Sequence, residues 1–185
     1  HDPRRHSPMN TTANTQNNAT AKSESVVINL MRRFAAFCTH LPHSPIAFLA
    51  RFSIAAVFWK SGQTKIQGFA IDLINGEFML GWPRLSDSAL ALFQEEYRLP
   101  LLSPEFAALM AAFVEHLFPV LLLLGLATRL SALALLGMTL TIQLFVYPDA
   151  YPTHGVWAAV LLYLLVQGPG KISLDNWVSR RVGVK

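Results

Sequence analysis

The stretch that decides the fold spans residues 107–127 and reads AALMAAFVEHLFPVLLLLGLA. As one helix it is long enough to cross a bilayer, because a transmembrane helix needs roughly 20 apolar residues. Its apolar character is interrupted by Glu115, His116 and the helix-breaking Pro119. A charged side chain at the centre of a bilayer costs ~2.5–3.5 kcal/mol, so such residues face the interior of a helix bundle and pair there. The sequence predicts this placement for Glu115.

The composition of the chain agrees with a membrane protein. Of its 185 residues, 52% are hydrophobic and only 14% are charged, whereas soluble domains carry about 25% charged residues. The net charge is +4, but the basic residues are scattered between apolar stretches, so nucleic acid is not an expected partner. Cys38 is the single cysteine, which rules out an internal disulfide and a cysteine-based zinc site. No metal site is expected.

Three further apolar segments accompany the one around Glu115, which as a whole runs over residues 106–127. They span residues 45–62, 130–146 and 156–167. The last of these is short for a transmembrane helix and becomes long enough if it extends back to Tyr151. Four membrane-crossing helices are therefore expected.

Basic residues are distributed unevenly among the connections between these segments. Lys and Arg lie before the first segment, at Arg129 between the second and third, and after the fourth, whereas residues 69–103 hold two basic and five acidic side chains. Because cytoplasmic loops are enriched in Lys and Arg, both termini are expected in the cytoplasm.

The predicted fold is an all-α membrane protein of the bacterial cytoplasmic (inner) membrane. It comprises a multi-pass, four-transmembrane-helix bundle at residues 45–182, with an extracytoplasmic loop at about residues 69–103. A soluble all-α bundle is the alternative, but it would have to hide its long apolar runs from water and leaves the uneven charge distribution unexplained.

The flanking segments carry weaker patterns. Residues 1–25 are expected to be a disordered tail or a processing remnant. Residues 26–41 place apolar side chains at helical spacing with a basic side, which is typical of an interfacial amphipathic helix; a soluble amphipathic helix packed on a core is the alternative.

Short helices are predicted over residues 86–99 and, after the cap at Ser173, near the C-terminus. Ser103, followed by Pro and Glu, predicts the start of the second long helix.

Polar side chains from different helices are predicted to share one depth. At 1.5 Å per residue, Lys60, Glu115 and Gln143 each lie ~18–21 Å from the cytoplasmic end of their helix. His154 would lie slightly farther out. Lys60 is the expected partner of Glu115, with Arg51 as the second choice. Two interpretations stay open: the pair only joins helices, or the layer forms a ligand site.

Candidate residues follow from this layer and its neighbours. His116 is explained more simply as a structural hydrogen-bonding residue than as a metal ligand, His154 is equally compatible with an interfacial position, and Arg129 is expected to extend to the cytoplasmic headgroups. The candidate ligand-binding residues are Lys60, Glu115, His116, Gln143, His154 and Trp157, and the candidate structural polar residues are Arg51, Lys65, Arg129 and Asp175.

These residues form a pattern that resembles the DoxX family of small bacterial integral membrane proteins. The similarity covers roughly residues 46–175 and rests on stretches such as ARFSIAAVFWKSGQTKIQGF (residues 50–69), LFQEEYRLPLLSP (residues 92–104) and QGPGKISLD (residues 167–175). The motif positions are Arg51, Ser61-Gly62 with Lys65, Glu115, Thr128-Arg129, His154 with Trp157, and Gly168-Pro169-Gly170 with Ser173 and Asp175.

The resemblance implies a four-helix inner-membrane bundle and two classes of function. Some relatives are subunits of quinone-linked sulfur oxidation or of terminal oxidase preparations, others are membrane partners of a redox-stress complex, and one branch accompanies proteins that handle copper stress.

One expected function is a redox-associated subunit that binds a quinone or another apolar small molecule, at most as part of a quinone-linked oxidoreductase. The alternative is a non-enzymatic membrane anchor or assembly partner in a redox-stress or copper/metal-homeostasis complex. A small transporter is a third interpretation, for which four helices without repeats leave little room. The expected partners are the lipid bilayer, a redox or metal-stress protein, and a second copy of the chain.

Overall fold

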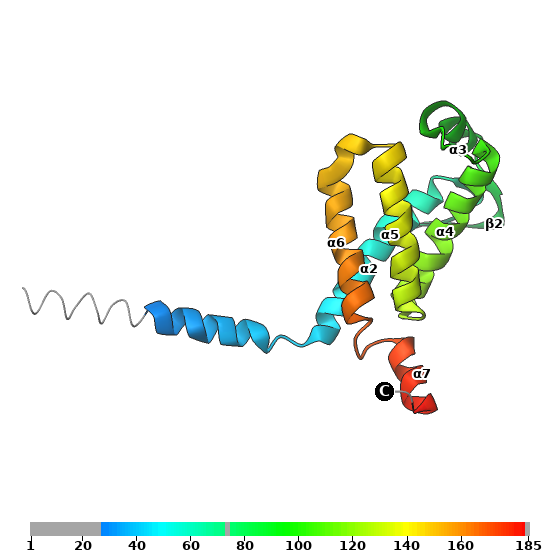
Figure 1. Ribbon diagram of the computed structural model, residues 1–185. Coiled ribbons are helices and arrows are strands. Elements are labelled where there is room, and N and C mark those ends of the chain that lie inside the picture. The colour runs from blue at the N-terminus through cyan, green and yellow to red at the C-terminus, as the bar shows by residue number, and fades with distance from the viewer. Residues whose placement is uncertain (1–26, 73–74, 184–185) are drawn as a thin grey trace, which may run out of the picture. The chain divides into compact units, whose positions relative to one another are not determined.

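The computed structural model describes residues 27–72 and 75–183, and it divides after Pro42 into two compact units (Figure 1). The described part of the first unit is helix α1 (Val27–Thr39). A helix is therefore present where the sequence predicts one, and its large apolar side chains, such as Leu30 and Phe34, are exposed. Its placement at a membrane surface remains a prediction. The predicted tail at residues 1–25 lies outside the described residues.

The second unit is built around four helices that occupy the four predicted apolar segments. They are α2 (His43–Gln63), α4 (Pro104–Leu124), α5 (Thr128–Phe145) and α6 (Tyr151–Gln167). Helix α2 packs on α4 and α6, and α5 packs on α4 and α6 (Figure 1). The core between them consists of Ile54, Ala55, Phe58, Leu122, Ala132, Leu135, Leu161 and Leu164.

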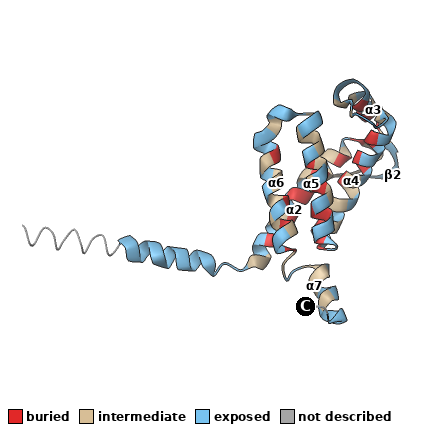
Figure 2. Cartoon of the chain, in the orientation of Figure 1, coloured by how far each residue is buried: buried red, intermediate tan, exposed pale blue. Residues whose placement is uncertain are grey.

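The outer faces of these helices are apolar, which is the pattern of a protein surrounded by lipid. Figure 2 shows buried positions between the helices and exposed positions along their outer sides. The exposed positions include large side chains such as Phe113, Leu133, Leu140 and Val166. Contiguous apolar surface of this kind is rare on soluble monomers and marks membrane or interaction surfaces.

Two of the described helices, α4 and α5, are each long and apolar enough to cross a membrane, and the number rises to three if α1 and α2 together form one broken span. The chain is thus a mostly helical membrane protein. That all four bundle helices cross the bilayer remains a prediction.

The predicted helix starts are confirmed where a capping side chain defines them. Ser103 accepts a hydrogen bond from the backbone N–H of Phe106 and opens α4, with a proline in its first turn. Ser173 does the same with the N–H of Asn176 and opens α7 (Leu174–Val182). Helix α4 continues through Pro119 and ends at Gly125, whose φ of 67° is a left-handed conformation that favours glycine.

The loop between α2 and α4 contains a β-hairpin that the sequence analysis did not predict. Strand β1 (Ile66–Asp72) pairs antiparallel with β2 (Glu77–Leu85), with an irregularity between Gln67 and Phe69. At this irregularity the two backbones approach closely, since a Cβ on Gly68 would lie 2.5 Å from the carbonyl oxygen of Trp82. The glycines of this segment thus permit a bulged hairpin.

The helix predicted over residues 86–99 is present, but it changes its geometry midway. It begins as α3 (Asp87–Leu92), capped by Ser86, and continues as a π-helical turn, η1 (Phe93–Tyr97). Single π-helical turns are rare in proteins, and those that occur are frequently found at functional sites. This segment packs against α4.

Arg51 is buried at the opposite end of the bundle from this loop and ties three segments together. Its Nη1 donates to the carbonyl oxygens of Leu122 and Leu123, at 3.1 and 3.2 Å, and its Nη2 donates to the carbonyl oxygen of Ile172. The last carbonyls of a helix have no partners within the helix, so a cation from α2 completes the end of α4.

Arg51 therefore does not pair with Glu115, and the prediction that made it the second choice of partner is wrong. Leu122 follows Glu115 by seven residues, which is ~10 Å along a helix. The Arg51 guanidinium binds carbonyl oxygens at the end of α4 and is therefore too far from Glu115 to pair with it.

We expect Arg51→Met to lower the free energy of unfolding by about 2–3 kcal/mol, because three carbonyl groups lose a charged donor. The measurement is thermal or denaturant unfolding in detergent, followed by circular dichroism. Arg84→Met is the matched control, since Arg84 is exposed on β2 and such substitutions stay within about 0.5 kcal/mol. Equal stability of the two variants would show that the Arg51 contacts do not hold the bundle.

Candidate functional site: a buried ion pair at an apolar cavity

A buried ion pair joins the end of α2 to the middle of α4. The Nζ of Lys65 lies 2.7 Å from Oε2 of Glu115. Both residues are almost completely shielded, with exposures of 5% for Lys65 and 1% for Glu115. Ser61 donates from Oγ to the other carboxylate oxygen, Oε1, at 3.2 Å, and Lys65 donates to the Oγ of Ser61 at 3.1 Å. The three side chains therefore form one closed polar cluster.

The local chain path explains why Lys65 reaches this position. Helix α2 ends at Gln63, and the backbone N–H of Lys65 donates to the carbonyl oxygen of Gly62 in a tight turn. The Lys65 side chain thereby returns over the last turn of α2, where Nζ also approaches the carbonyl oxygen of Ser61 at 3.3 Å. A turn at the end of a helix thus places a cation beside the neighbouring helix.

Gly62 allows α2 to approach α4 at this level. A Cβ at this position would lie 2.8 Å from Cε1 of His116 and 3.0 Å from Cβ of Glu115. Contacts below 3.0 Å require a neighbour to move, so a larger residue would push the two helices apart where the ion pair forms.

The prediction that Lys60 pairs with Glu115 is wrong. Lys60 is exposed on α2, whereas Gly62, which packs against α4, is buried. Two residues correspond to about 200° around a helix, so Lys60 lies on the side opposite the α2–α4 contact. Depth along a helix does not determine the direction of a side chain, which depends on which face of the helix packs against its neighbour. Lys65, counted among the structural polar residues, takes this position, and Ser61 was missed as its companion.

A cavity of about 280 Å³ adjoins the ion pair. Its polar lining groups include Ser61, Lys65 and Glu115, and most of the other lining groups are apolar or aromatic. The apolar walls come from α4, from α5 and from the loop helix, which is the segment formed by α3 and η1. They include Phe93, Tyr97, Met110, Ala111, Met138 and Ile142. A small space with apolar walls and a few convergent polar groups is the usual form of a site for a small ligand.

The loop helix closes one side of this cavity through aromatic contacts. Phe93 and Tyr97 line the cavity, and their rings lie 4.8 Å apart. The Tyr97 ring also meets the Tyr147 ring edge-on at 5.7 Å, and the Tyr147 hydroxyl donates to Oε1 of Glu96 at 2.5 Å. Donation to this carboxylate raises the pKa of Tyr147, and burial raises the pKa of Tyr97. Both hydroxyl groups therefore stay protonated at neutral pH.

The sequence model of the DoxX family matches residues 46–148. The chain belongs to the DoxX family. The matched region contains most of α2 and all of the hairpin, the loop helix, α4 and α5. It thus contains the ion pair and every side chain named above as lining the cavity. Comparison with curated proteins and with solved structures finds no match.

The remaining predicted ligand residues do not line the cavity of this DoxX protein. In His116 the Nδ1 lies 2.6 Å from the carbonyl oxygen of Ala112 and the Nε2 lies 2.8 Å from Nε2 of Gln63. This arrangement fits a neutral ring that donates from Nδ1 and accepts at Nε2. The Trp59 ring packs edge-on against it at 5.1 Å. His116 thus joins α2 to α4, as its structural interpretation predicts.

Gln143, His154 and Trp157 form a separate cluster between α5 and α6. The Nδ1 of His154 lies 2.8 Å from Oε1 of Gln143, and the Trp157 ring lies 5.1 Å from the His154 ring and 5.5 Å from the Phe58 ring. The single polar layer expected from depth is therefore divided in two. Within the described residues, no group of three or more His, Cys, Asp or Glu side chains is arranged to hold a metal ion.

We expect Lys65→Met to destabilise the protein by about 3–5 kcal/mol, because it leaves Glu115 buried without its counter-ion. Lys60→Met is the matched control and should change the stability by less than about 0.5 kcal/mol. The measurement is unfolding in detergent. Removing both charges in Lys65→Met/Glu115→Leu should recover part of the loss, since an apolar replacement of a buried pair is often neutral. If the two lysine variants were equally stable, Lys65 would not be the partner of Glu115.

Proposed function

We propose that this DoxX protein is a redox-associated membrane subunit that binds a quinone or another apolar small molecule in the cavity beside Lys65 and Glu115. The observation that carries the proposal is a buried, hydrogen-bonded ion pair facing a cavity with mostly apolar walls. A purely structural ion pair requires no adjoining cavity. A quinone head requires an apolar slot with hydrogen-bond donors for its carbonyl oxygens.

The residues present fit such a head group. The three N–H donors of the Lys65 ammonium point at Glu115 and at the two oxygens of Ser61, so a quinone carbonyl oxygen would accept from Lys65 in place of one of the Ser61 oxygens. The cavity volume of about 280 Å³ is near the lower end for ligand pockets, so it suits a ring and not a long tail. Met110 lines the cavity and is 41% exposed, which gives an apolar tail an exit toward lipid.

Glu115 and Lys65 would also handle protons. A bound quinone supplies electron-acceptor chemistry, and its reduction requires protons at the carbonyl oxygens. In the ion pair Nζ of Lys65 carries the proton and would deliver it to a quinone carbonyl oxygen, while the Glu115 carboxylate, held by Ser61, stabilises the charged lysine until then. The electrons would come from a partner subunit, so the protein would act as part of an oxidoreductase and not alone.

The proposed topology places this site in the outer half of the bacterial cytoplasmic membrane. All four bundle helices would cross the bilayer, with both termini in the cytoplasm, because the basic residues concentrate at that end. The cavity lies toward the other end of α4 and α5, beneath the loop helix.

The hairpin favours a second candidate function, that of a membrane anchor or assembly partner in a redox-stress or copper-homeostasis complex. Strand β2 exposes four large apolar side chains, Phe78, Met79, Leu80 and Trp82. Exposed apolar groups on an edge strand mark a contact surface for another protein. A redox or metal-stress protein, or a second copy of the chain, would be the partner.

To test the ligand proposal, the protein is purified in detergent and its lipid extract is analysed for quinone, followed by titration with a short-chain quinone. Quinone should co-purify with the wild type. Ala111→Phe should weaken binding at least about tenfold, equivalent to ~1.4 kcal/mol, because the new ring fills the cavity. Ala56→Phe, on the exposed side of α2, is the control and should bind normally. Absence of quinone from the extract together with no binding on titration would contradict the proposal.

The anchor function predicts a different set of results. Trp82→Ser with Leu80→Ser should abolish cross-linking to a partner in native membranes, while quinone binding stays unchanged. The measurement is cross-linking followed by mass spectrometry. Capture of the same partner by the variant would show that the hairpin is not the contact.

A further inference from the structure

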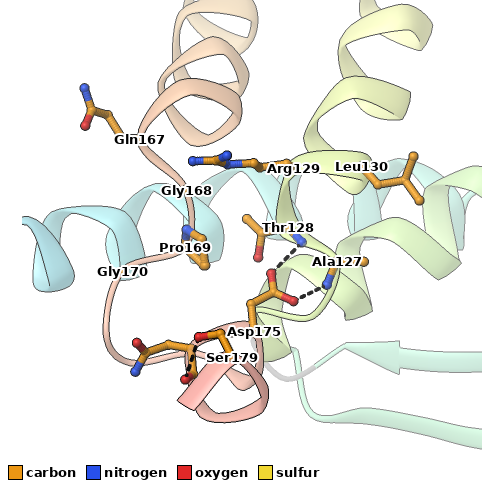
Figure 3. A pocket seen from close by; sticks show the side chains of 11 residues that line it. Ala127, Thr128, Arg129, Leu130, Gln167, Gly168, Pro169, Gly170, Asp175 and Ser179 are labelled. Atoms are coloured by element: carbon orange, nitrogen blue, oxygen red, sulfur yellow. Dashed lines mark hydrogen bonds between the residues drawn. The ribbon is translucent and has the colours of Figure 1, made fainter. Parts of the chain in front are cut away.

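A second cavity, of about 450 Å³, lies at the other end of α5 (Figure 3). The first turn of α5, the segment after α6 and helix α7 form its walls. The first turn of α5 contributes Thr128 and Arg129, the Gly168–Gly170 segment follows α6, and α7 contributes Asp175 and Ser179.

The walls of this cavity are fixed by hydrogen bonds between distant parts of the chain. Asp175 accepts from the backbone N–H of Ala127 at 2.7 Å and from that of Thr128 at 2.9 Å, so α7 caps the start of α5 (Figure 3). Its own N–H donates to the carbonyl oxygen of Gly125 at 2.8 Å. The N-terminus of α5 is therefore already occupied by a carboxylate and is not itself the site.

Two groups in the lining have hydrogen-bonding capacity that the described residues do not use. The Oγ1 of Thr128 is buried and has no hydrogen-bond partner in the described part of the chain, and the whole residue is 0% exposed. A buried hydroxyl without a partner is unfavourable, so a ligand that accepts from it is stabilised. Arg129 has five N–H donors, of which Nη2 donates to the carbonyl oxygen of Val166 at 3.3 Å.

The lining presents opposite charges to one space. Arg129 brings a guanidinium, whose planar donors match phosphate oxygens, and Asp175 brings a carboxylate. A purely anionic ligand would be repelled by Asp175, and a purely cationic one by Arg129. A zwitterion with a phosphate and a primary ammonium satisfies both charges.

Helix α7 beside this cavity has the composition of a helix that lies among lipid headgroups. It exposes Trp177 and Val178, and the Arg181 guanidinium lies 4.7 Å from the centre of the Trp177 ring. Short helices with apolar and basic faces of this kind lie in the membrane interface. The basic residues of the C-terminal segment assign this end to the cytoplasmic leaflet.

We propose that this cavity binds a phosphoethanolamine headgroup of a membrane lipid, with the phosphate on Arg129 and the ammonium beside Asp175. Thr128 would donate to a phosphate oxygen. The proposal is independent of the quinone site, which lies at the other end of α5.

The test uses the full chain in nanodiscs of equal phosphatidylethanolamine, phosphatidylcholine and phosphatidylglycerol, followed by native mass spectrometry of the lipid retained after extraction. Phosphatidylethanolamine should be enriched over both other lipids. Arg129→Gln should reduce the enrichment about tenfold, equivalent to ~1.4 kcal/mol, because the phosphate loses a charged donor. Arg98→Gln, in the loop beyond the other end of α5, should keep it. If Arg129→Gln did not fold, Arg129→Lys, which keeps the charge and loses the planar donors, should show an intermediate loss.

A second variant separates the two charges. Asp175→Asn keeps a capping side chain and removes the negative charge, so it should shift the preference toward phosphatidylglycerol.

Four results would overturn the proposal: equal retention of phosphatidylethanolamine and phosphatidylcholine, a preference of the wild type for phosphatidylglycerol, no effect of the Arg129 variants, or displacement of the lipid by excess inorganic phosphate, which would assign the site to free phosphate.

Discussion

The carboxylate of Glu115 must be neutralised where it is buried, and this constraint organises the half of the bundle that lies next to the hairpin. A charge cannot reach water from the interior of an apolar bundle, so its partner has to be brought to it. The partner is Lys65, at 2.7 Å, and the lysine is available only because α2 stops at Gln63 and turns back. The close approach at Gly62, the hydroxyl of Ser61 and the start of the hairpin all follow from this arrangement.

At the other end of the bundle, charged side chains are also paired with opposite charges, but here the opposite charges are the partial charges of helix termini. The carbonyl end of α4 is completed by the cation Arg51, and the N–H end of α5 by the anion Asp175. Each charge therefore opposes the partial charge of the helix terminus that it meets. These contacts hold the segment after α6 and helix α7 against the bundle. They also leave Arg129 and Thr128 facing a cavity, in contrast to the closed ion pair of Lys65 and Glu115.

The sequence predicts features that depend on neighbouring residues and fails for those that depend on packing. Ser103 and Ser173 start helices because a capping side chain acts within three residues, and both are confirmed. The prediction that Lys60 pairs with Glu115 is wrong because depth along a helix does not fix the direction of a side chain. Only the packing of Gly62 on α4 shows which face of α2 is buried.

The hairpin and the division of the polar layer were missed for the same reason. Gly68 and Gly81 are compatible with an irregular loop until their strands are paired. Gln143 and His154 do lie beside each other, but α5 and α6 hold them in a cluster of their own, away from Glu115. The membrane character of the protein, by contrast, was evident from the apolar runs alone.

The most direct test of the central claim is infrared difference spectroscopy of the purified protein, recorded with and without a short-chain quinone. If the ion pair faces the bound ligand, the carboxyl bands of Glu115 should shift on addition of the quinone, and these bands should be absent from the difference spectrum of Glu115→Gln. Quinone binding that leaves every carboxyl band unchanged would contradict the account, because the ligand would then lie elsewhere.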